Sequence, residues 1–172
     1  VGCHESGDKT AAGLDTVAGR RAPSEIVPGP FDGQPFSFMQ VVQPVLDALV
    51  IQREEGVWLE VTNLVIPTLN DDLAMIRRMS KWIRDNLGED TPLHFSGFTP
   101  MYRMRNLPRT PTTVLEQARD EALDVGLHYV YIGNVPGGAS GENTICPGCG
   151  NIVVNRFQYR SRTNLIDANH CA

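Results

Sequence analysis

The sequence contains no run of about 20 apolar residues, the length that a helix needs to cross a bilayer. Its first residues also lack the charged-then-apolar pattern of a secretory signal. Acidic residues outnumber basic ones by 20 to 15, giving a net charge of −5, whereas a nucleic-acid platform needs an excess of basic residues. We therefore expect a cytoplasmic protein with neither a membrane nor a nucleic acid as its partner.

Cysteine is also scarce, with 4 residues in a chain of 172. Disulfide-framed domains are denser in cysteine, and two of these four form a Cys-x-x-Cys pair, which suits a reducing compartment and a bound metal better. The hydrophobic content of 41% is enough to bury a core. One ordinary domain with a small appendage is the expected organisation.

Residues 1–40 are rich in glycine and proline without a sustained period, which indicates loop or disorder. Cys3 and His4 lie there, and we interpret this pair as incidental. Pro44 then suits the first turn of a helix that carries apolar residues at helical spacing and ends at Gly56.

Strands and helices alternate after this point. Val57–Pro67 is almost continuously apolar, as in a strand covered on both faces. A turn at 68–72 with capping residues precedes a helix that ends at Gly88, and Leu93–Phe98 forms the next strand. Thr113–Glu116 matches a capping box that opens a helix ending at Gly126, and a third strand follows at Leu127–Ile132. This β-α-β-α-β order predicts parallel strands with right-handed crossovers.

Two of these strands carry polar residues at alternate positions, which place their side chains on one face. Glu60 and Thr62 form one such pair, and His94 and Ser96 form the other. Such a polar face could line a barrel lumen or a cleft. Glu60 could equally pair with an arginine as structural support, and a strand histidine such as His94 is more often simply hydrogen-bonded in place.

The segment Met101–Pro111 carries Arg103, Arg105 and Arg109 after the second strand. Loops at the carboxyl ends of parallel strands are where α/β folds bind ligands, so these arginines could meet an anionic group. A solvated loop is the simpler explanation. The glycine-rich loop at 133–141 lacks the Lys-Ser/Thr of a phosphate-binding loop.

Cys146 and Cys149 lie on a Pro/Gly turn, and a possible hairpin leads from them to Cys171 after 21 intervening residues. This is close to zinc-ribbon spacing. A ribbon's fourth ligand would lie two residues beyond Cys171; either the sequence is cut inside its metal site, which we favour, or His170 is the ligand. A redox dithiol is the rival interpretation, but such motifs precede a helix, whereas glycine and a hairpin follow here.

Several motifs together resemble the radical SAM enzymes of the AmmeMemoRadiSam system, which are related to the pyruvate formate-lyase activating enzymes. The resemblance covers roughly residues 43–171 and is carried by Trp58-Leu59-Glu60-Val61-Thr62, Val65-Ile66-Pro67-x-x-Asn70-Asp71, His94-Phe95-Ser96-x-Phe98-x-Pro100, Tyr129-Val130-Tyr131-x-Gly133-Asn134-Val135-Pro136-Gly137 and Glu142-Asn143-Thr144-x-Cys146-Pro147-x-Cys149-Gly150. The matching segment resembles the C-terminal half of such an enzyme.

The resemblance implies an α/β fold that is the C-terminal part of a partial (β/α)6 radical SAM barrel, with a zinc-ribbon-like appendage. In such enzymes a [4Fe-4S] cluster cleaves S-adenosylmethionine reductively to a 5′-deoxyadenosyl radical, which takes hydrogen from a protein or small-molecule substrate. A flavodoxin or ferredoxin donates the electron. Residues expected to line the S-adenosylmethionine and substrate cavity are Glu60, Thr62, Asn70, His94 and Ser96.

The sequence departs from the family at the cluster, because these residues contain no Cys-x3-Cys-x2-Cys motif. We therefore expect no catalytic residue in this chain, no activity of the chain alone, and the missing motif in the reading frame upstream. The expected divisions are an unassigned segment at 1–40, β/α units at 41–133, and a glycine-rich loop with a truncated ribbon at 134–172, where Cys146, Cys149 and Cys171 bind zinc. The alternative is a non-enzymatic α/β scaffold with a zinc-ribbon interaction module.

Overall fold

The computed structural model describes residues 36–135, 140–157, 160–163, 165–167 and 170–171. Predictions that fall on residues 1–35, including Cys3 and His4, and on residues 136–139 of the glycine-rich loop lie outside the described residues. The helices are α1 (Phe36–Glu54), α2 (Leu73–Leu87) and α3 (Thr112–Asp124), with 3-10 turns η2 (Tyr102–Met104) and η3 (Ser140–Glu142). The strands are β1 (Val61–Val65), β2 (Leu93–Gly97), β3 (Val130–Gly133), β4 (Thr144–Ile145), β5 (Ile152–Phe157), β6 (Arg160–Thr163), β7 (Leu165–Asp167) and β8 (His170–Cys171).

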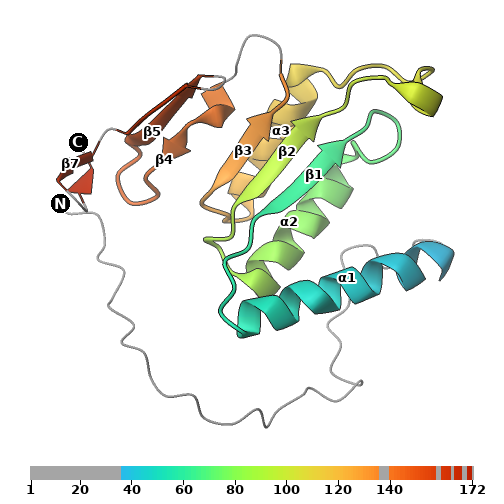
Figure 1. Ribbon diagram of the computed structural model, residues 1–172, viewed down its shortest axis with the longest axis horizontal. Helices are drawn as coiled ribbons and strands as arrows, with labels where there is room; N and C mark the ends of the chain where they lie inside the picture. Colours follow the sequence, from blue (N-terminus) through green and yellow to red (C-terminus); the bar gives the residue numbers. More distant parts are fainter. Residues whose placement is uncertain (1–35, 136–139, 158–159, 164, 168–169, 172) are drawn as a thin grey trace, which may run out of the picture.

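The main sheet has the order β1-β2-β3, and both strand pairs are parallel. The predicted parallel β-α-β-α-β arrangement is therefore confirmed. Because sequential strand order with right-handed crossovers puts successive helices on one side, α2 and α3 both lie behind the sheet in Figure 1. A doubly wound sheet would instead reverse its strand order and carry helices on both faces. The described strands do not close into a barrel.

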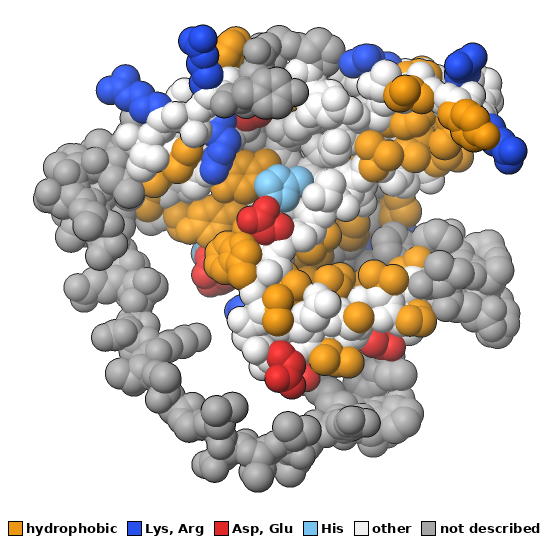
Figure 2. Space-filling view, viewed as in Figure 1, with side chains coloured by type: hydrophobic (Ala, Val, Ile, Leu, Met, Phe, Trp, Pro, Cys, Tyr) orange, Lys and Arg blue, Asp and Glu red, His pale blue; other side chains and the backbone are white. Residues whose placement is uncertain are grey.

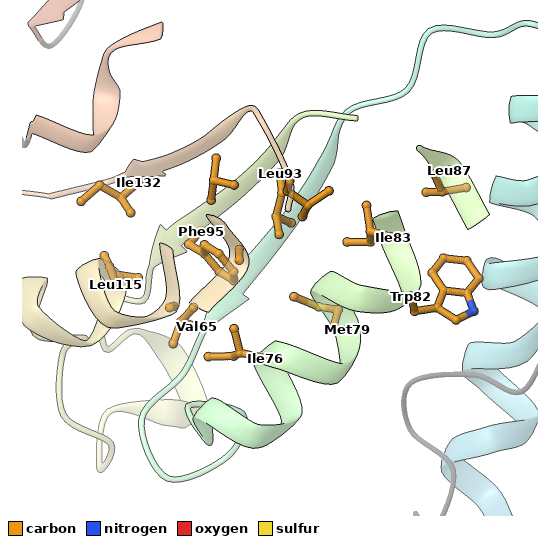
Figure 3. Packing of buried hydrophobic residues seen from close by; sticks show 14 of the residues in the cluster. Val65, Ile76, Met79, Trp82, Ile83, Leu87, Leu93, Phe95, Leu115 and Ile132 are labelled. Atoms are coloured by element: carbon orange, nitrogen blue, oxygen red, sulfur yellow. The ribbon is translucent and has the colours of Figure 1, made fainter. Parts of the chain in front are cut away.

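The core fills the space between the sheet and these two helices. Phe95 on β2 is fully buried, with Ile76 of α2 and Leu115 of α3 each 1% exposed in the same cluster (Figure 3). Helix α1 adds Leu46 to this cluster. The apolar faces of α2 and α3 are thus buried against the sheet, and this packing holds one face of the sheet in place.

The ends of α2 follow the sequence signals closely. The Asp72 side chain accepts a hydrogen bond from the Met75 backbone N–H at 2.9 Å, as a helix N-cap does. Gly88 ends the helix with φ of +106°, a conformation that favours glycine. Gly126 follows α3 with φ of +98°.

Two helix starts differ from the prediction. Helix α1 begins at Phe36, so Pro44 lies inside it rather than in its first turn, and the end of the segment expected to be loop is helical. Proline in a helix interior removes one backbone hydrogen bond, and the longer helix tolerates that loss. The capping box at Thr113–Glu116 was wrong: α3 starts at Thr112, its N-cap is Pro111, and no side chain caps it.

The first strand is also shorter than predicted, and only one of its faces is covered. Along β1 the side chains alternate between exposed and partly or fully buried, with Val65 fully buried and Leu64 44% exposed. The expectation of burial on both faces was wrong, because Thr62 and Leu64 are exposed on the second face. That face is consequently available to form a site.

A second, antiparallel sheet follows in the order β4-β5-β6. The predicted hairpin after the Cys-x-x-Cys pair is confirmed as β5 and β6, whose register pairs Asn155 with Arg162. Strands β7 and β8 form a separate two-stranded sheet. In the part of the chain that the structure describes, no helix has the length and apolar character required to traverse a bilayer.

Candidate functional site

The open face of the main sheet carries two rows of side chains set by the strand register. One row joins Thr62, His94 and Tyr131, and the next joins Leu64, Ser96 and Gly133. Thr62, His94 and Ser96 therefore share one face of the sheet, and the predicted placement of His94 and Ser96 on one face of their strand is confirmed. Figure 2, which looks onto this face, shows a histidine beside an acidic side chain, bordered by apolar and basic groups.

A cleft of about 980 Å³ lies over this face, between the main sheet and the β4–β5 hairpin. It runs from the segments that precede the three strands to the carboxyl end of β3, and Arg109 joins it from the loop after β2. Its lining mixes aromatic, acidic and basic side chains: Trp58, Glu60, Pro92, His94, Arg109, Tyr129, Tyr131, Ile132, Gly133, Asn134, Val135, Glu142, Thr144 and Arg156. A cleft of this size and mixed chemistry is typical of a small-molecule site.

The imidazole of His94 is held by a carboxylate. His94 Nε2 lies 3.1 Å from Glu60 Oε2, and the side chains are 36% and 54% exposed. The other carboxylate oxygen, Oε1, accepts a hydrogen bond from Trp58 Nε1 at 3.3 Å. Because Glu60 can only accept when ionised, Nε2 carries the proton in the neutral imidazole. The partner of Glu60 is thus a histidine, and not an arginine as expected if Glu60 only supported the structure.

Tyr131 is the centre of the aromatic side of the cleft. Its ring stacks on His94, with centroids 5.0 Å apart and planes 24° from parallel. The guanidinium of Arg156 lies 5.4 Å from the same ring centroid, within the range of a cation–π contact. The Tyr131 hydroxyl lies 3.0 Å from Thr144 Oγ1. The stacking and the hydrogen bond fix the ring, and through it the imidazole.

The second sheet supplies one wall of the cleft. The backbone N–H of Arg156 donates to Asn143 Oδ1 at 2.7 Å, and its Nη1 donates to the Glu142 carbonyl and to Thr144 Oγ1. These bonds join β5 to the segment that precedes the Cys-x-x-Cys turn. The wall therefore depends on the fold of the β4–β5 hairpin.

A single cation lines the cleft from the loop after β2. Arg109 precedes Thr110, whose buried hydroxyl donates to the Val65 carbonyl at 2.6 Å and accepts from the Phe98 N–H at 2.8 Å. The backbone beside Arg109 is thereby tied to the ends of two strands. The guanidinium itself forms no hydrogen bond or ion pair with another described residue.

Non-glycine residues with positive φ occur in the segments that follow the strands of the main sheet. Thr68, Tyr102 and Asn134 have φ of 70°, 48° and 58°, and they are the described non-glycine residues with positive φ. Each lies in the segment that follows a different strand of the main sheet. Such conformations are costly and cluster at functional sites, so this edge of the sheet is where function is expected.

Other predicted site residues lie elsewhere. Asn70 closes the turn after β1, where its Oδ1 accepts from the Ile66 N–H at 2.6 Å and its Nδ2 donates to the Leu64 carbonyl at 2.9 Å. Thr62 and Ser96 lie on the open face but not among the residues that line the cleft. In the predicted arginine loop, the Arg103 guanidinium lies 5.5 Å from the Tyr102 ring, outside the cleft.

The Cys-x-x-Cys segment forms the tip of the β4–β5 hairpin. The Cys146 N–H donates to the Asn151 carbonyl at 2.8 Å, and the Gly150 N–H donates to the Cys146 carbonyl at 2.9 Å. Gly150 has φ of +76°, which explains a glycine after the second cysteine. Cys146 is buried and Cys149 is exposed. The described residues contain no group of three or more potential metal ligands, and the side chain of Cys171 lies outside them.

Trp58, Tyr131, Arg156 and Thr144 were missed as site residues. Tyr131 could have been found, because it alternates with the buried residues of its strand as His94 does. Trp58 and Glu60 are two residues apart in an extended segment, and this spacing likewise indicates that their side chains share one face. Arg156 and Thr144 reach the cleft only through the return of the second sheet, and no local pattern in the sequence indicates that contact.

The chain is similar to a protein of Methanocaldococcus jannaschii named "Uncharacterized protein MJ0808", with 44% identity over 126 residues. The match covers 73% of this chain and 38% of that protein, so the chain spans well under half the length of its relative. No family model matches the chain.

Proposed function

We propose that this chain is the C-terminal part of a radical SAM enzyme of the glycyl-radical-activating type. In this proposal the open face of the main sheet is the inner face of the barrel. The observation that carries it is the sequential parallel sheet with both helices behind it and a cleft of about 980 Å³ in front. The motif resemblance and the length of the relative agree with a chain that forms one part of a larger protein.

The cleft fits S-adenosylmethionine better than it fits a cluster. Its aromatic rings, carboxylate and arginines suit a nucleoside carrying both charges, whereas no three potential metal ligands come together among the described residues. In this proposal Trp58 and Tyr131 pack against the ligand, and Glu60 and His94 position polar groups. The chemistry supplied by a bound [4Fe-4S] cluster is reductive cleavage of the sulfonium. Its ligands would come from outside this chain.

The test uses the protein encoded by the extended reading frame, purified anaerobically with iron and sulfide. We expect a cluster absorbance near 400 nm and reductant-dependent formation of 5′-deoxyadenosine. Tyr131→Ala should lower this rate at least about tenfold through lost packing, whereas Arg105→Gln, which lies outside the cleft, should leave it unchanged. The chain alone should show neither property.

Two results would contradict the proposal. Cleavage of S-adenosylmethionine by the chain alone would show that the catalytic part is present here. If the upstream sequence lacks the three-cysteine motif, the protein has no expected ligands for the cluster and the proposed radical chemistry is wrong. The proposed protein is cytoplasmic, accepts an electron from a flavodoxin or ferredoxin, and acts on a protein or small-molecule radical substrate.

The alternative function is a non-enzymatic scaffold with a zinc-binding interaction module. It rests on the hairpin tip, where backbone hydrogen bonds and Gly150 shape a tight turn between Cys146 and Cys149. Capture of a partner through residues 134–172 would support this function. Discovery of the cluster motif upstream would favour the enzyme.

A further inference from the structure

His94 is presented to the cleft in a defined orientation. Its Nε2 is engaged by Glu60, and its ring packs on Tyr131. Among the described residues, none forms a hydrogen bond with Nδ1. Since a neutral imidazole with a protonated Nε2 has a lone pair on Nδ1, the free nitrogen is a hydrogen-bond acceptor.

The Glu60 carboxylate is itself held in position to bind His94 Nε2. Trp58 donates to one oxygen of Glu60, and His94 donates to the other. A carboxylate that fixes one imidazole nitrogen determines which nitrogen remains basic. Glu60 is thus a positioning residue, and the base that it orients is His94.

The same cleft contains a guanidinium that forms no ion pair with any described residue. It belongs to Arg109, which precedes Thr110 and its hydrogen bonds to two strand ends. Arginine binds carboxylate and phosphate groups through two parallel hydrogen bonds. A ligand that meets both side chains must carry an anionic group and a hydroxyl or similar proton donor.

We infer that the cleft binds a small anionic molecule whose negative group contacts Arg109 and whose O–H or N–H donates to His94 Nδ1. Carboxylate and phosphate are both compatible with Arg109, and the experiment separates them. The site lies in the cleft that the proposed function assigns to S-adenosylmethionine, but binding of a small anion requires only residues of this chain and can be tested without the cluster.

The structure offers a matched control for the histidine. His128 also pairs with a carboxylate, with Nδ1 2.8 Å from Asp90 Oδ1, and its side chain is 34% exposed against 36% for His94. It lies outside the cleft. The two imidazoles therefore differ in their access to the proposed ligand while sharing exposure and partner type.

The experiment records imidazole and guanidinium ¹⁵N resonances of the full labelled chain, with histidines neutral and assigned by substitution. Without ligand, His94 should be protonated at Nε2 only, and Glu60→Ala should yield a mixture of tautomers. Hydrogen phosphate or glycolate should shift the His94 Nδ1 resonance. Sulfate and acetate, which lack the donor, should shift Arg109 but leave Nδ1 in place. The His128 resonances should not respond.

Substitution of the arginine completes the test. Arg109→Gln should weaken binding of the responding anion about tenfold or more, the loss expected for a charge-assisted contact, whereas Arg105→Gln on the same loop should not. A response to only one donor-bearing anion supports the site and identifies its anionic group. The inference is wrong if His94 is protonated at Nδ1, if neither phosphate nor glycolate shifts Nδ1, or if His128 responds equally.

Discussion

Thr110 shows how one buried hydroxyl can hold two strand ends together. It bonds to the Val65 carbonyl at the end of β1 and to the Phe98 N–H just after β2, and it is 7% exposed. Its own N–H donates to the Phe98 carbonyl at 3.1 Å. The position of Arg109 in the cleft therefore depends on its neighbour.

Thr110→Val keeps the shape of this side chain but removes its hydrogen bonds to the Phe98 N–H and the Val65 carbonyl. We expect a loss of about 1–3 kcal/mol in the free energy of unfolding, measured by urea denaturation, together with weaker phosphate or glycolate binding. Thr113→Val, at an exposed position of α3, should change stability by less than about 0.5 kcal/mol. Equal losses in the two variants would show that the hydroxyl bonds contribute nothing specific.

Asp85 is the described residue whose ionisation depends most clearly on the fold. Its hydrogen bond with Lys81 is the main cause that lowers the pKa of this carboxyl, burial opposes the change, and Arg84 lowers the pKa further. The Lys81 Nζ to Asp85 Oδ2 distance is 2.6 Å, but both groups are largely exposed. Solvent screening keeps such a pair weak.

A folded-state pKa below the unfolded value stabilises the protein above the unfolded pKa, and this contribution is lost as the pH falls through the folded pKa. Asp85→Asn should therefore cost up to about 0.5 kcal/mol at neutral pH. The difference from the natural protein should shrink below about pH 4. Urea denaturation at the two pH values measures this change, and a difference that grows in acid would contradict the assignment.

At the scale of elements, the predictable features were those specified locally. The apolar stripe of α2 and its ends at Asp72 and Gly88 follow from side-chain spacing and capping. The start of α1 was missed because proline was taken as a first-turn residue, although a helix can continue through it. Whether the second face of β1 is covered depends on other elements, so an apolar run alone predicted burial that the structure lacks.

The two helix starts provide a direct comparison of a formed cap with an expected one. Asp72→Ala removes the acceptor of the Met75 N–H and should lower the free energy of unfolding by about 1 kcal/mol. Glu116→Ala, at the residue that would complete the wrongly predicted capping box, should have little effect because no side chain caps α3. Denaturation of both variants measures these changes. A larger loss of unfolding free energy for Glu116→Ala than for Asp72→Ala would show that Glu116 does cap α3.

At the scale of the whole molecule, the sequence predicted half of the site. Glu60 and His94 were identified by strand alternation, but their mutual contact spans neighbouring strands and depends on register. Asn70 was assigned to the cavity through the resemblance, whereas its hydrogen bonds place it in a turn. Arg156 and Thr144 belong to a second sheet, so only the three-dimensional fold brings them to the cleft.

The metal prediction also concerns the whole molecule, because zinc should stabilise the second sheet and leave the stability of the main sheet unchanged. Zinc ligation by Cys146 and Cys149, with Cys171, should order the hairpin that carries them and add to its folding free energy. Amide exchange should therefore slow in β4 and β5 on zinc addition and stay unchanged in β1, β2 and β3. Arg156 and Thr144, which form a wall of the cleft, should also show slower amide exchange.

Substitutions identify the ligands by competition with a chromophoric zinc chelator. Cys149→Ser should abolish binding, whereas Cys3→Ser should leave it unchanged. Because three thiolates make an incomplete site, zinc should bind more weakly than to a four-ligand ribbon, and an added C-terminal segment that places a cysteine at Cys-x-x-Cys spacing from Cys171 should strengthen it. His170→Ala should have little effect; if it loses zinc as completely as Cys149→Ser, the histidine is the fourth ligand and the truncated-ribbon account is wrong.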